Sequence, residues 1–287
     1  MKKTLLICTS AFLTAGLLMA GCNSNTEITP MPATSVTSET SVTEEPSEPK
    51  EETSVLISEI QSEAESTEPE IDFSSLKAGD TVTIGTFEQD GDAGNGKEPI
   101  EWDVLFADDE KALVVSKYVL FCGEFGKNWD YEGCLIWDYF DNEFYNNAFT
   151  DAEKEKIPTV TIATRDADDT SGKIFPLSIE EVKKYYSFNG WDDEVGYSDK
   201  LIISPTLFAF NSGVRSKTIT EDTYKEELQP YGVPDSVIGT QGAAWWLRDS
   251  NQNTGMIYYI TYFGQFGMRE GHSYEDVGYR PAMYVKK

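Results

Sequence analysis

Trp245-Trp246-Leu247-Arg248-Asp249 opens the last and most strand-like part of this 287-residue chain. Residues 256–263 follow, a β-branched and aromatic run that predicts a strand, and Gly264 and Gly267 break this run. A final strand is predicted over residues 279–285. Because successive strand residues point to opposite faces, one tryptophan should enter the core and the other should reach a surface or a neighbouring layer.

The first residues resemble a bacterial lipoprotein signal. Lys2 and Lys3 precede an apolar run over residues 5–20, which is shorter than the roughly twenty apolar residues of a membrane span. Cys22 follows this run, and the resemblance to a lipobox implies that a signal peptide over residues 1–21 is cleaved and that Cys22 carries lipid. An ordinary secretory signal is the alternative. The lipoprotein interpretation puts the protein, lipid-anchored to the membrane, on the extracytoplasmic face of a bacterial cell.

Residues 22–72 are predicted to form a disordered acidic tether. Between residues 23 and 72 there are 13 acidic residues against one basic residue, Lys50, and Ser, Thr and Pro are frequent. Such a segment buries too little apolar surface to offset the entropy of ordering, and its like charges extend it further.

The remaining part, residues 73–287, is long enough for a single globular domain. It carries 37 acidic and 20 basic residues, a net charge of −17. An acidic surface argues against binding nucleic acid or anionic lipid, because their phosphates require the opposite charge.

Local patterns predict short strands and helices in this domain. Thr150 with Glu153, and Ser178 with Glu181, have the spacing of capping boxes at helix starts. Apolar residues recur at helical spacing over residues 136–145. The other expected elements are strands over residues 81–87, 100–105, 112–116, 160–164 and 173–177, and helices over residues 204–210 and 220–225.

The loop after the first predicted strand resembles part of a calcium-binding loop. Asp90, Asp92 and Glu101 occupy its first, third and twelfth places. Gly94 stands where a ligand belongs, and Asn95 stands where the sharp-turn glycine belongs. We therefore predict a polar hairpin loop and no cofactor, with calcium at the three carboxylates as the alternative.

Cys122 and Cys134 are the only cysteines after Cys22. In an oxidising location, an even pair at this spacing predicts a disulfide, and closing such a loop contributes about 3 kcal/mol. A reactive or copper-binding thiol pair is the alternative, although no histidine lies near it in the sequence.

Catalysis has little support in the sequence. The single histidine, His272, lies in a segment rich in Gly, Ser and Glu, and there is no Gly-x-Ser-x-Gly motif. A glycosidase pair of carboxylates stays an open alternative because acidic residues are abundant. Arg248 and Arg280 are interpreted as structural residues that fix the sheet through acidic or backbone acceptors, with ligand recognition as the alternative.

The segment over residues 263–277 and its neighbours form the predicted binding surface. Aromatic residues and arginine are enriched at interfaces and suit sugar platforms. The predicted ligand-binding residues are Trp246, Tyr262, Phe266, Arg269, His272 and Tyr274. Alternatively, these side chains only cover a sheet edge.

Several motifs, taken in order, resemble the exported bacterial domain family DUF6273. They are Gly79-Asp80-Thr81-Val82, Gly96-Lys97-Glu98-Pro99-Ile100-Glu101-Trp102, Ala112-Leu113-Val114-Val115-Ser116-Lys117-Tyr118, the Cys122 and Cys134 pair, Asn142-Glu143-Phe144-Tyr145, Ile174-Phe175-Pro176-Leu177-Ser178, Trp245-Trp246-Leu247-Arg248 and Gly278-Tyr279-Arg280-Pro281-Ala282. The chain departs from this pattern at Trp137, where arginine is usual, and at Asp249-Ser250, where Ser-Pro is usual.

A more distant similarity links the two Arg-containing strands to the ending of formylglycine-generating-enzyme-type, C-type-lectin-like folds. It implies a mixed α+β domain of twisted, mainly antiparallel sheets with a few packed helices, and with the two ends of the domain close together. The oxidase chemistry does not carry over, because no cysteine follows Cys134.

These observations favour a lipid-anchored, non-catalytic module that binds a glycan or a surface protein and no nucleic acid. A hydrolase of cell-wall or other polysaccharide and a structural component of an envelope complex are the alternatives.

Overall fold

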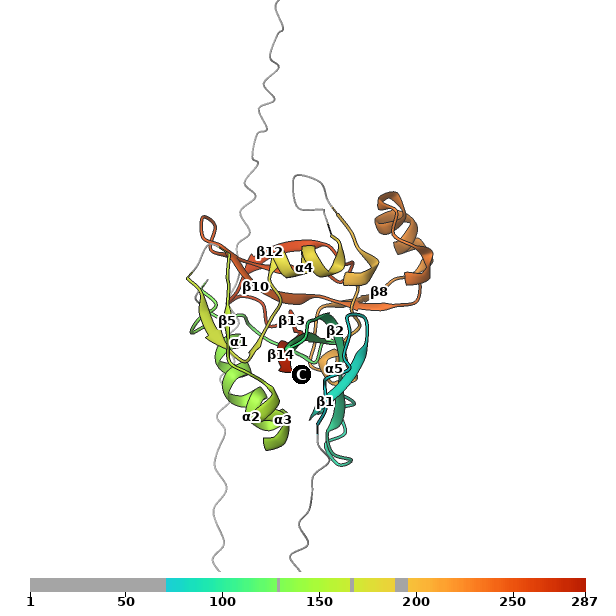
Figure 1. Cartoon of the computed structure of the whole chain (residues 1–287). Coiled ribbons are helices and arrows are strands. Elements are labelled where there is room, and N and C mark those ends of the chain that lie inside the picture. Colours follow the sequence, from blue (N-terminus) through green and yellow to red (C-terminus); the bar gives the residue numbers. More distant parts are fainter. Residues whose placement is uncertain (1–70, 128–129, 166–167, 189–195) are drawn as a thin grey trace, which may run out of the picture. The chain divides into compact units, whose positions relative to one another are not determined.

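The computed structural model describes residues 71–127, 130–165, 168–188 and 196–287 (Figure 1). The predicted signal peptide, Cys22 and nearly all of the predicted tether lie outside the described residues. Within the described part, two five-stranded sheets, two short hairpins and short helices form one α+β arrangement, which confirms the predicted fold class at this level.

The first sheet is antiparallel throughout. Its strands, in spatial order, are β1 (Thr81–Phe87), β2 (Glu98–Ala107), β3 (Lys111–Ser116), β14 (Ala282–Lys286) and β7 (Ile174–Phe175). Ala112 and the next four residues of β3 are all buried, so both faces of this strand are covered. Beside β14, Lys287 donates from Nζ to the carbonyl of Leu76 at 3.1 Å. The two ends of the domain therefore lie close together.

The second sheet is mixed, because β10 and β13 are parallel while its other neighbouring strands are antiparallel. Its strands, in spatial order, are β12 (Phe266–Glu270), β11 (Met256–Ile260), β10 (Trp245–Asn251), β13 (Gly278–Tyr279) and β4 (Phe121–Cys122). Trp245 and Trp246 are both 0% exposed, so neither tryptophan reaches the surface. Their indole N–H groups donate to the carbonyls of Leu201 and Gly123, at 3.4 and 3.0 Å.

The strand predicted over residues 279–285 is interrupted. It divides into β13 in the second sheet and β14 in the first, and the break falls at Arg280 and Pro281, where proline has no N–H for a ladder. Arg280 is buried, donates from Nε to the carbonyl of Ser116 at 2.9 Å and lies 4.9 Å from the ring centre of Trp245. This arginine therefore connects β3 of one sheet with β10 of the other.

The aromatic run over residues 256–263 forms β11 and the turn after it. Gly264 lies in this turn with a φ of 71°, a conformation that glycine adopts without steric cost. Gly267, by contrast, lies within β12 opposite Tyr259, and a Cβ there would be 2.6 Å from the tyrosine ring. The prediction that Gly267 breaks the strand is therefore wrong.

The helices are short, and no candidate membrane-spanning helix is found among the described residues. Both predicted capping boxes are present, with Thr150 and Glu153 at the start of α3 and Ser178 and Glu181 at the start of α4. The helix predicted over residues 136–145 is confirmed as part of a longer helical stretch. In order, the helices are α1 (Leu135–Asp138), the π-helical η1 (Tyr139–Phe144), α2 (Tyr145–Ala148), α3 (Asp151–Lys156), α4 (Ile179–Tyr186), η2 (Asp199–Leu201), α5 (Leu207–Asn211), α6 (Glu221–Thr223), the π-helical η3 (Tyr224–Leu228), η4 (Gln229–Tyr231) and η5 (Asp235–Val237).

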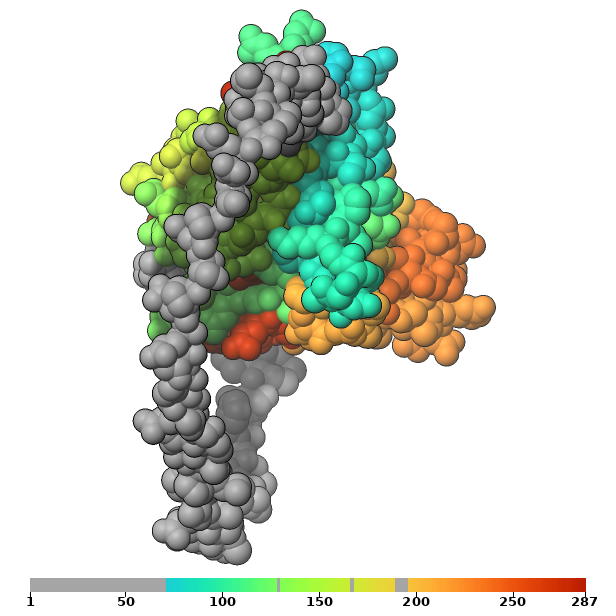
Figure 2. Space-filling view, turned by 90° about the horizontal axis from the view of Figure 1, so that it is seen from below, coloured from blue at the N-terminus to red at the C-terminus, as the bar shows by residue number. Residues whose placement is uncertain are grey.

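A small satellite of the fold projects beyond the sheets, and it is the orange part of the chain in Figures 1 and 2. It contains η3, η4 and the hairpin of β8 (Ser216–Thr218) with β9 (Gln241–Ala243). The other short hairpin, formed by β5 (Val160–Ile162) and β6 (Thr170–Gly172), is not part of the satellite. The satellite has its own apolar cluster, separate from the large core of the two sheets. This cluster consists of Ile202, Ile219, Tyr224, Leu228, Val233, Val237 and Phe263.

Arg248, in the central strand of the second sheet, is linked by an ion pair to the start of α4. Its side chain is 4% exposed and makes a bidentate ion pair with Glu181, with N–O distances of 2.6 and 3.0 Å. It also donates to the carbonyls of Ala163 and Pro176, both at 2.8 Å. Four of its five N–H donors thus have an acceptor.

Asp249 continues this attachment of α4 through its buried carboxylate. The carboxylate accepts from the backbone N–H groups of Arg165 and Ile179, at 2.8 and 2.5 Å. Burial raises the pKa of Asp249, and the neighbouring Arg248 and the two N–H donors act in the opposite sense. The departure from the Ser-Pro pattern at this position therefore places a carboxylate on the first turn of α4.

The predicted disulfide is wrong, because Cys122 and Cys134 are both free thiols. Cys122 Sγ lies 3.5 Å from the carbonyl of Ser212. Cys134 caps α1, where its Sγ accepts from the backbone N–H of Trp137 at 3.4 Å. Burial raises the pKa of Cys122 to about 11 and that of Cys134 to about 12. The even cysteine count suggested a disulfide bond, but the two sulfur atoms make separate contacts, with Ser212 and with Trp137.

Replacing Arg248 with methionine should lower the free energy of unfolding by about 3 kcal/mol or more, because Glu181 loses its ion partner in a largely buried place. Chemical denaturation of the full chain measures this. The control is Lys225→Met, which removes an exposed pair with Glu221 and should cost less than about 0.5 kcal/mol. Equal costs for the two variants would contradict the importance of the buried pair.

Both cysteines should alkylate slowly in the folded chain at about pH 8, because their raised pKa values keep the thiols protonated. Half-buried Cys122 should react before buried Cys134, and denaturation should accelerate both reactions. Mass spectrometry follows the labels, and a linked Cys122–Cys134 peptide in a non-reducing digest would refute the assignment of two free thiols.

The raised thiol pKa values also predict a pH dependence of stability. The burial of the two neutral thiols contributes fully to the stability of the fold below about pH 9, and this contribution is lost as pH rises through the folded-state pKa values.

Candidate functional site

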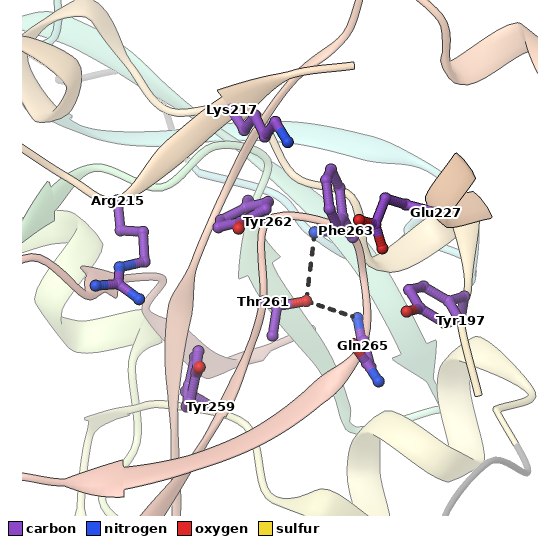
Figure 3. A pocket seen from close by; sticks show the side chains of 9 residues that line it. All are labelled: Tyr197, Arg215, Lys217, Glu227, Tyr259, Thr261, Tyr262, Phe263 and Gln265. Atoms are coloured by element: carbon purple, nitrogen blue, oxygen red, sulfur yellow. Dashed lines mark hydrogen bonds between the residues drawn. The ribbon is translucent and has the colours of Figure 1, made fainter. Parts of the chain in front are cut away.

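A pocket of about 270 Å³ lies where the satellite meets the second sheet (Figure 3). Its walls come from β8, from η3 and from β11 with the turn that follows it. Phe263 belongs to the apolar cluster of the satellite, whereas Tyr259 packs on the large core. Small-molecule sites are frequent at such junctions between packed units. The lining residues are Tyr197, Arg215, Lys217, Glu227, Tyr259, Thr261, Tyr262, Phe263 and Gln265.

The turn after β11 is shaped by local hydrogen bonds. Thr261 Oγ1 accepts from the backbone N–H groups of Phe263 and Gln265 at 3.4 and 3.3 Å, the two dashed lines of Figure 3. Gly242 allows β9 to pass against this turn, because a Cβ at Gly242 would lie 2.0 Å from the carbonyl oxygen of Tyr262. The backbone of the turn is therefore fixed on both sides, which positions its aromatic side chains.

Aromatic rings and polar groups share the lining. Tyr262 and Phe263 form an edge-to-face pair with ring centres 4.5 Å apart. In Figure 3, Arg215 and Tyr259 lie at one end of the pocket, and Glu227 and Tyr197 lie at the other. A lining of this kind offers ring faces together with hydrogen-bond donors and acceptors, which is the composition that suits polar, partly apolar ligands.

Two tyrosine hydroxyls of the pocket, those of Tyr197 and Tyr259, are neutral donors at physiological pH because their pKa values are raised. Burial raises the pKa of Tyr259, while Arg269 and Arg215 act in the opposite sense. Burial also raises the pKa of Tyr197, and the nearby Tyr231 and Glu227 add to this effect.

One carboxylate, Asp276, organises the positive charge beside the pocket. It accepts from Arg215 Nε at 2.9 Å and from Arg269 Nη1 at 3.2 Å. The Arg269 guanidinium lies 3.3 Å from the ring centre of Tyr274 and 5.6 Å from that of Tyr259. Arg269 therefore supports the wall of the pocket, whereas Arg215 forms part of its lining.

The predicted ligand-binding residues are only partly brought together. Tyr262 lines the pocket. Arg269 does not line it but packs between Tyr274 and the lining residue Tyr259. Phe266 packs against Phe188 with ring centres 5.0 Å apart. The other two do not line this pocket: His272 is exposed on the loop after β12, and Trp246 is completely buried with its N–H satisfied.

The acidic loop groups different carboxylates from those predicted for calcium. Glu88, Asp90 and Glu98 each offer an oxygen within 4.8 Å of the others. Glu101 instead pairs with Lys117 at 3.1 Å. Asp92 accepts from the backbone N–H of Gly94 within the loop. Of the three predicted residues, only Asp90 thus belongs to the cluster, whose oxygens also accept backbone N–H groups of the same loop.

Of the nine lining residues, only Tyr262 was among the predicted ligand-binding residues, and Phe263 and Gln265 lie in the predicted segment. Four others, Tyr197, Arg215, Lys217 and Glu227, lie far from that segment in the sequence. A weak signal was present in the sequence. Arg215 and Lys217 are two basic residues at strand spacing in a strongly acidic domain, and residues i and i+2 of a strand share a face. Tyr197 and Glu227 gave no such signal, because only the tertiary fold brings them to the turn after β11.

Comparison with known families places the pocket within a described domain. The family described as "Domain of unknown function (DUF6273)" matches residues 109–287, which include the whole second sheet and all nine lining residues. No curated protein and no solved structure matches the chain. Since the match covers more than half of the 287 residues, the chain belongs to the DUF6273 family.

Proposed function

We propose that this protein is a lipid-anchored, non-catalytic binding module on the extracytoplasmic face of a bacterial membrane, and that its pocket binds a glycan. The observation that carries the proposal is the combination of four aromatic residues with Arg, Lys, Glu, Thr and Gln side chains around one opening. Sugars present apolar C–H faces and many hydroxyls, so they need ring faces and convergent hydrogen-bonding groups together.

The size of the pocket supports a small binding unit. Its volume of about 270 Å³ is just below the range of roughly 300–1,000 Å³ that is typical of drug-sized ligands. One sugar residue with part of its neighbour fits this space better than a long oligosaccharide. A terminal or branching sugar is therefore the unit that we assign to it.

Binding is favoured over hydrolysis by the carboxylates at the site. Glycoside hydrolysis generally requires two carboxylates on either side of the scissile bond. Among the described residues that line the pocket, Glu227 is the one carboxylate, and the nearby Asp276 is held by two arginines. This arrangement supports recognition without turnover.

The membrane anchor and the finer fold are part of the same proposal. The lipobox-like residues before Cys22 support anchoring, and the acidic segment after them is suited to a spacer. The proximity of Leu76 and Lys287, with the mainly antiparallel sheets, is compatible with a C-type-lectin-like fold. A glycan-binding head held away from the membrane is the role that unites these features.

Tyr262→Ala should reduce glycan affinity about tenfold or more while leaving the melting temperature nearly unchanged, because the ring contributes a face of the pocket. The full chain in detergent is screened on a glycan array, and the bound glycan is then titrated against each variant. Gln265→Ala, which removes a polar lining group, serves as a second variant.

The matched control is Phe210→Ala on α5, which removes a ring that is 50% exposed outside this pocket. Loss of binding in Phe210→Ala, together with unchanged binding in Tyr262→Ala, would move the site to α5. A chain that binds no glycan and engages a surface protein would favour the envelope-complex alternative, and turnover of a polysaccharide would favour the hydrolase.

A further inference from the structure

The pocket carries positive charge in a domain that is otherwise strongly acidic. Residues 73–287 have 37 acidic and 20 basic residues, yet Arg215 and Lys217 both line this pocket (Figure 3). Two residues apart on an extended strand, their Cα atoms are separated by about 7 Å. Both side chains line the same pocket, so both cations can contact one bound ligand.

The Arg215 guanidinium has unused donors. Only its Nε is engaged, by Asp276 at 2.9 Å, and no acceptor in the described part of the chain takes a hydrogen bond from its two terminal nitrogens. The backbone N–H of Arg215 also donates to the carbonyl of Asp276, at 2.6 Å. Asp276 thus fixes the direction of the side chain, and an edge of the planar fork stays available for a bidentate acceptor.

Lys217 also lacks an acidic partner among the described residues. Its Nζ lies 5.2 Å from the ring centre of Phe263, and no described carboxylate oxygen comes within ion-pair distance. Glu227 lines the same pocket and has no described ion partner either. Lys217 and Glu227 therefore remain available to donate to and accept from the hydroxyl groups of a ligand.

The charges at the site sum to one positive unit. Arg215, Arg269 and Asp276 together leave a single positive charge, and Lys217 and Glu227 cancel each other. Glu270 and Glu275, the chain neighbours of Arg269 and Asp276, do not line the pocket. A ligand group with one negative charge would neutralise the site.

We propose that the pocket selects a sugar that bears a carboxylate, with the carboxylate on the terminal nitrogens of Arg215 and the ring against Tyr262. This inference rests on the proposed glycan-binding function and narrows it to one chemical class. The planar fork of arginine matches the planar carboxylate in two parallel hydrogen bonds. Sialic acids and uronic acids share this chemistry, and the experiment distinguishes them.

The test compares matched acidic and neutral probes on the full chain in detergent. The pairs are 3′-sialyllactose with lactose, and methyl glucuronide with methyl glucoside, each displayed at equal density. At least one acidic probe should bind about tenfold or more tightly than its neutral partner, because hydrogen bonds to charged groups exceed neutral ones. The pair that shows this preference identifies the source of the carboxylate.

Arg215→Gln should abolish the preference for the acidic probe, Lys217→Gln should weaken it, and Arg215→Lys should retain only part of it. Lys225→Gln is the matched control, because it removes the same charge from η3 outside the pocket and should keep the preference. Equal binding of acidic and neutral probes would overturn the carboxylate inference while leaving glycan binding intact. Exclusive binding of sulfated glycans would also overturn it, and the absence of any glycan binding would overturn both proposals.

Discussion

The bidentate ion pair between Arg248 and Glu181 is the interaction on which the arrangement of the two sheets depends. Arg248 belongs to β10, the central strand of the second sheet, while Glu181 lies in the first turn of α4, which follows β7 of the first sheet. Burying a guanidinium costs several kcal/mol unless its donors are satisfied. Here the donors reach Glu181 and two carbonyls. The same requirement holds for Arg280, which spans from β3 to the ring of Trp245. Polar contacts of defined geometry thus set how the apolar layers meet.

The second sheet, fixed by these contacts, holds the lining residues of the pocket in defined positions. With β10 anchored, β11 and its turn have a defined position, and the satellite closes against them through Gly242 and Phe263. Catalytic and binding groups are held best when rigid elements and supporting contacts orient them. Asp276 has this role for Arg215, and the stack of Arg269 on Tyr274 has it for the wall. The pocket is therefore built on an apolar junction and lined with polar groups that the domain core does not require.

Local chemistry made much of the fold predictable. The capping boxes at Ser178 and Thr150 involve residues only three positions apart, and such patterns can be recognised in the sequence. The division of the last strand was not predicted, because it depends on which sheet each half joins. The disulfide was inferred from cysteine count and location, neither of which contains the orientation of the sulfur atoms. Tyr262 was the one predicted ligand-binding residue that lines the pocket. Arg215 and Glu227 were not predicted, because only the long-range contacts of the folded chain bring them to the pocket.

We propose that ligand recognition occurs at the junction of the satellite and the second sheet. Hydrogen–deuterium exchange of the full chain, with and without a saturating glycan, measures which segments the ligand protects. We expect slower exchange in the segments over residues 215–217 and 259–265, which form the lining and its turn. Slower exchange confined to α5, or to the acidic loop of Glu88, Asp90 and Glu98, would contradict it.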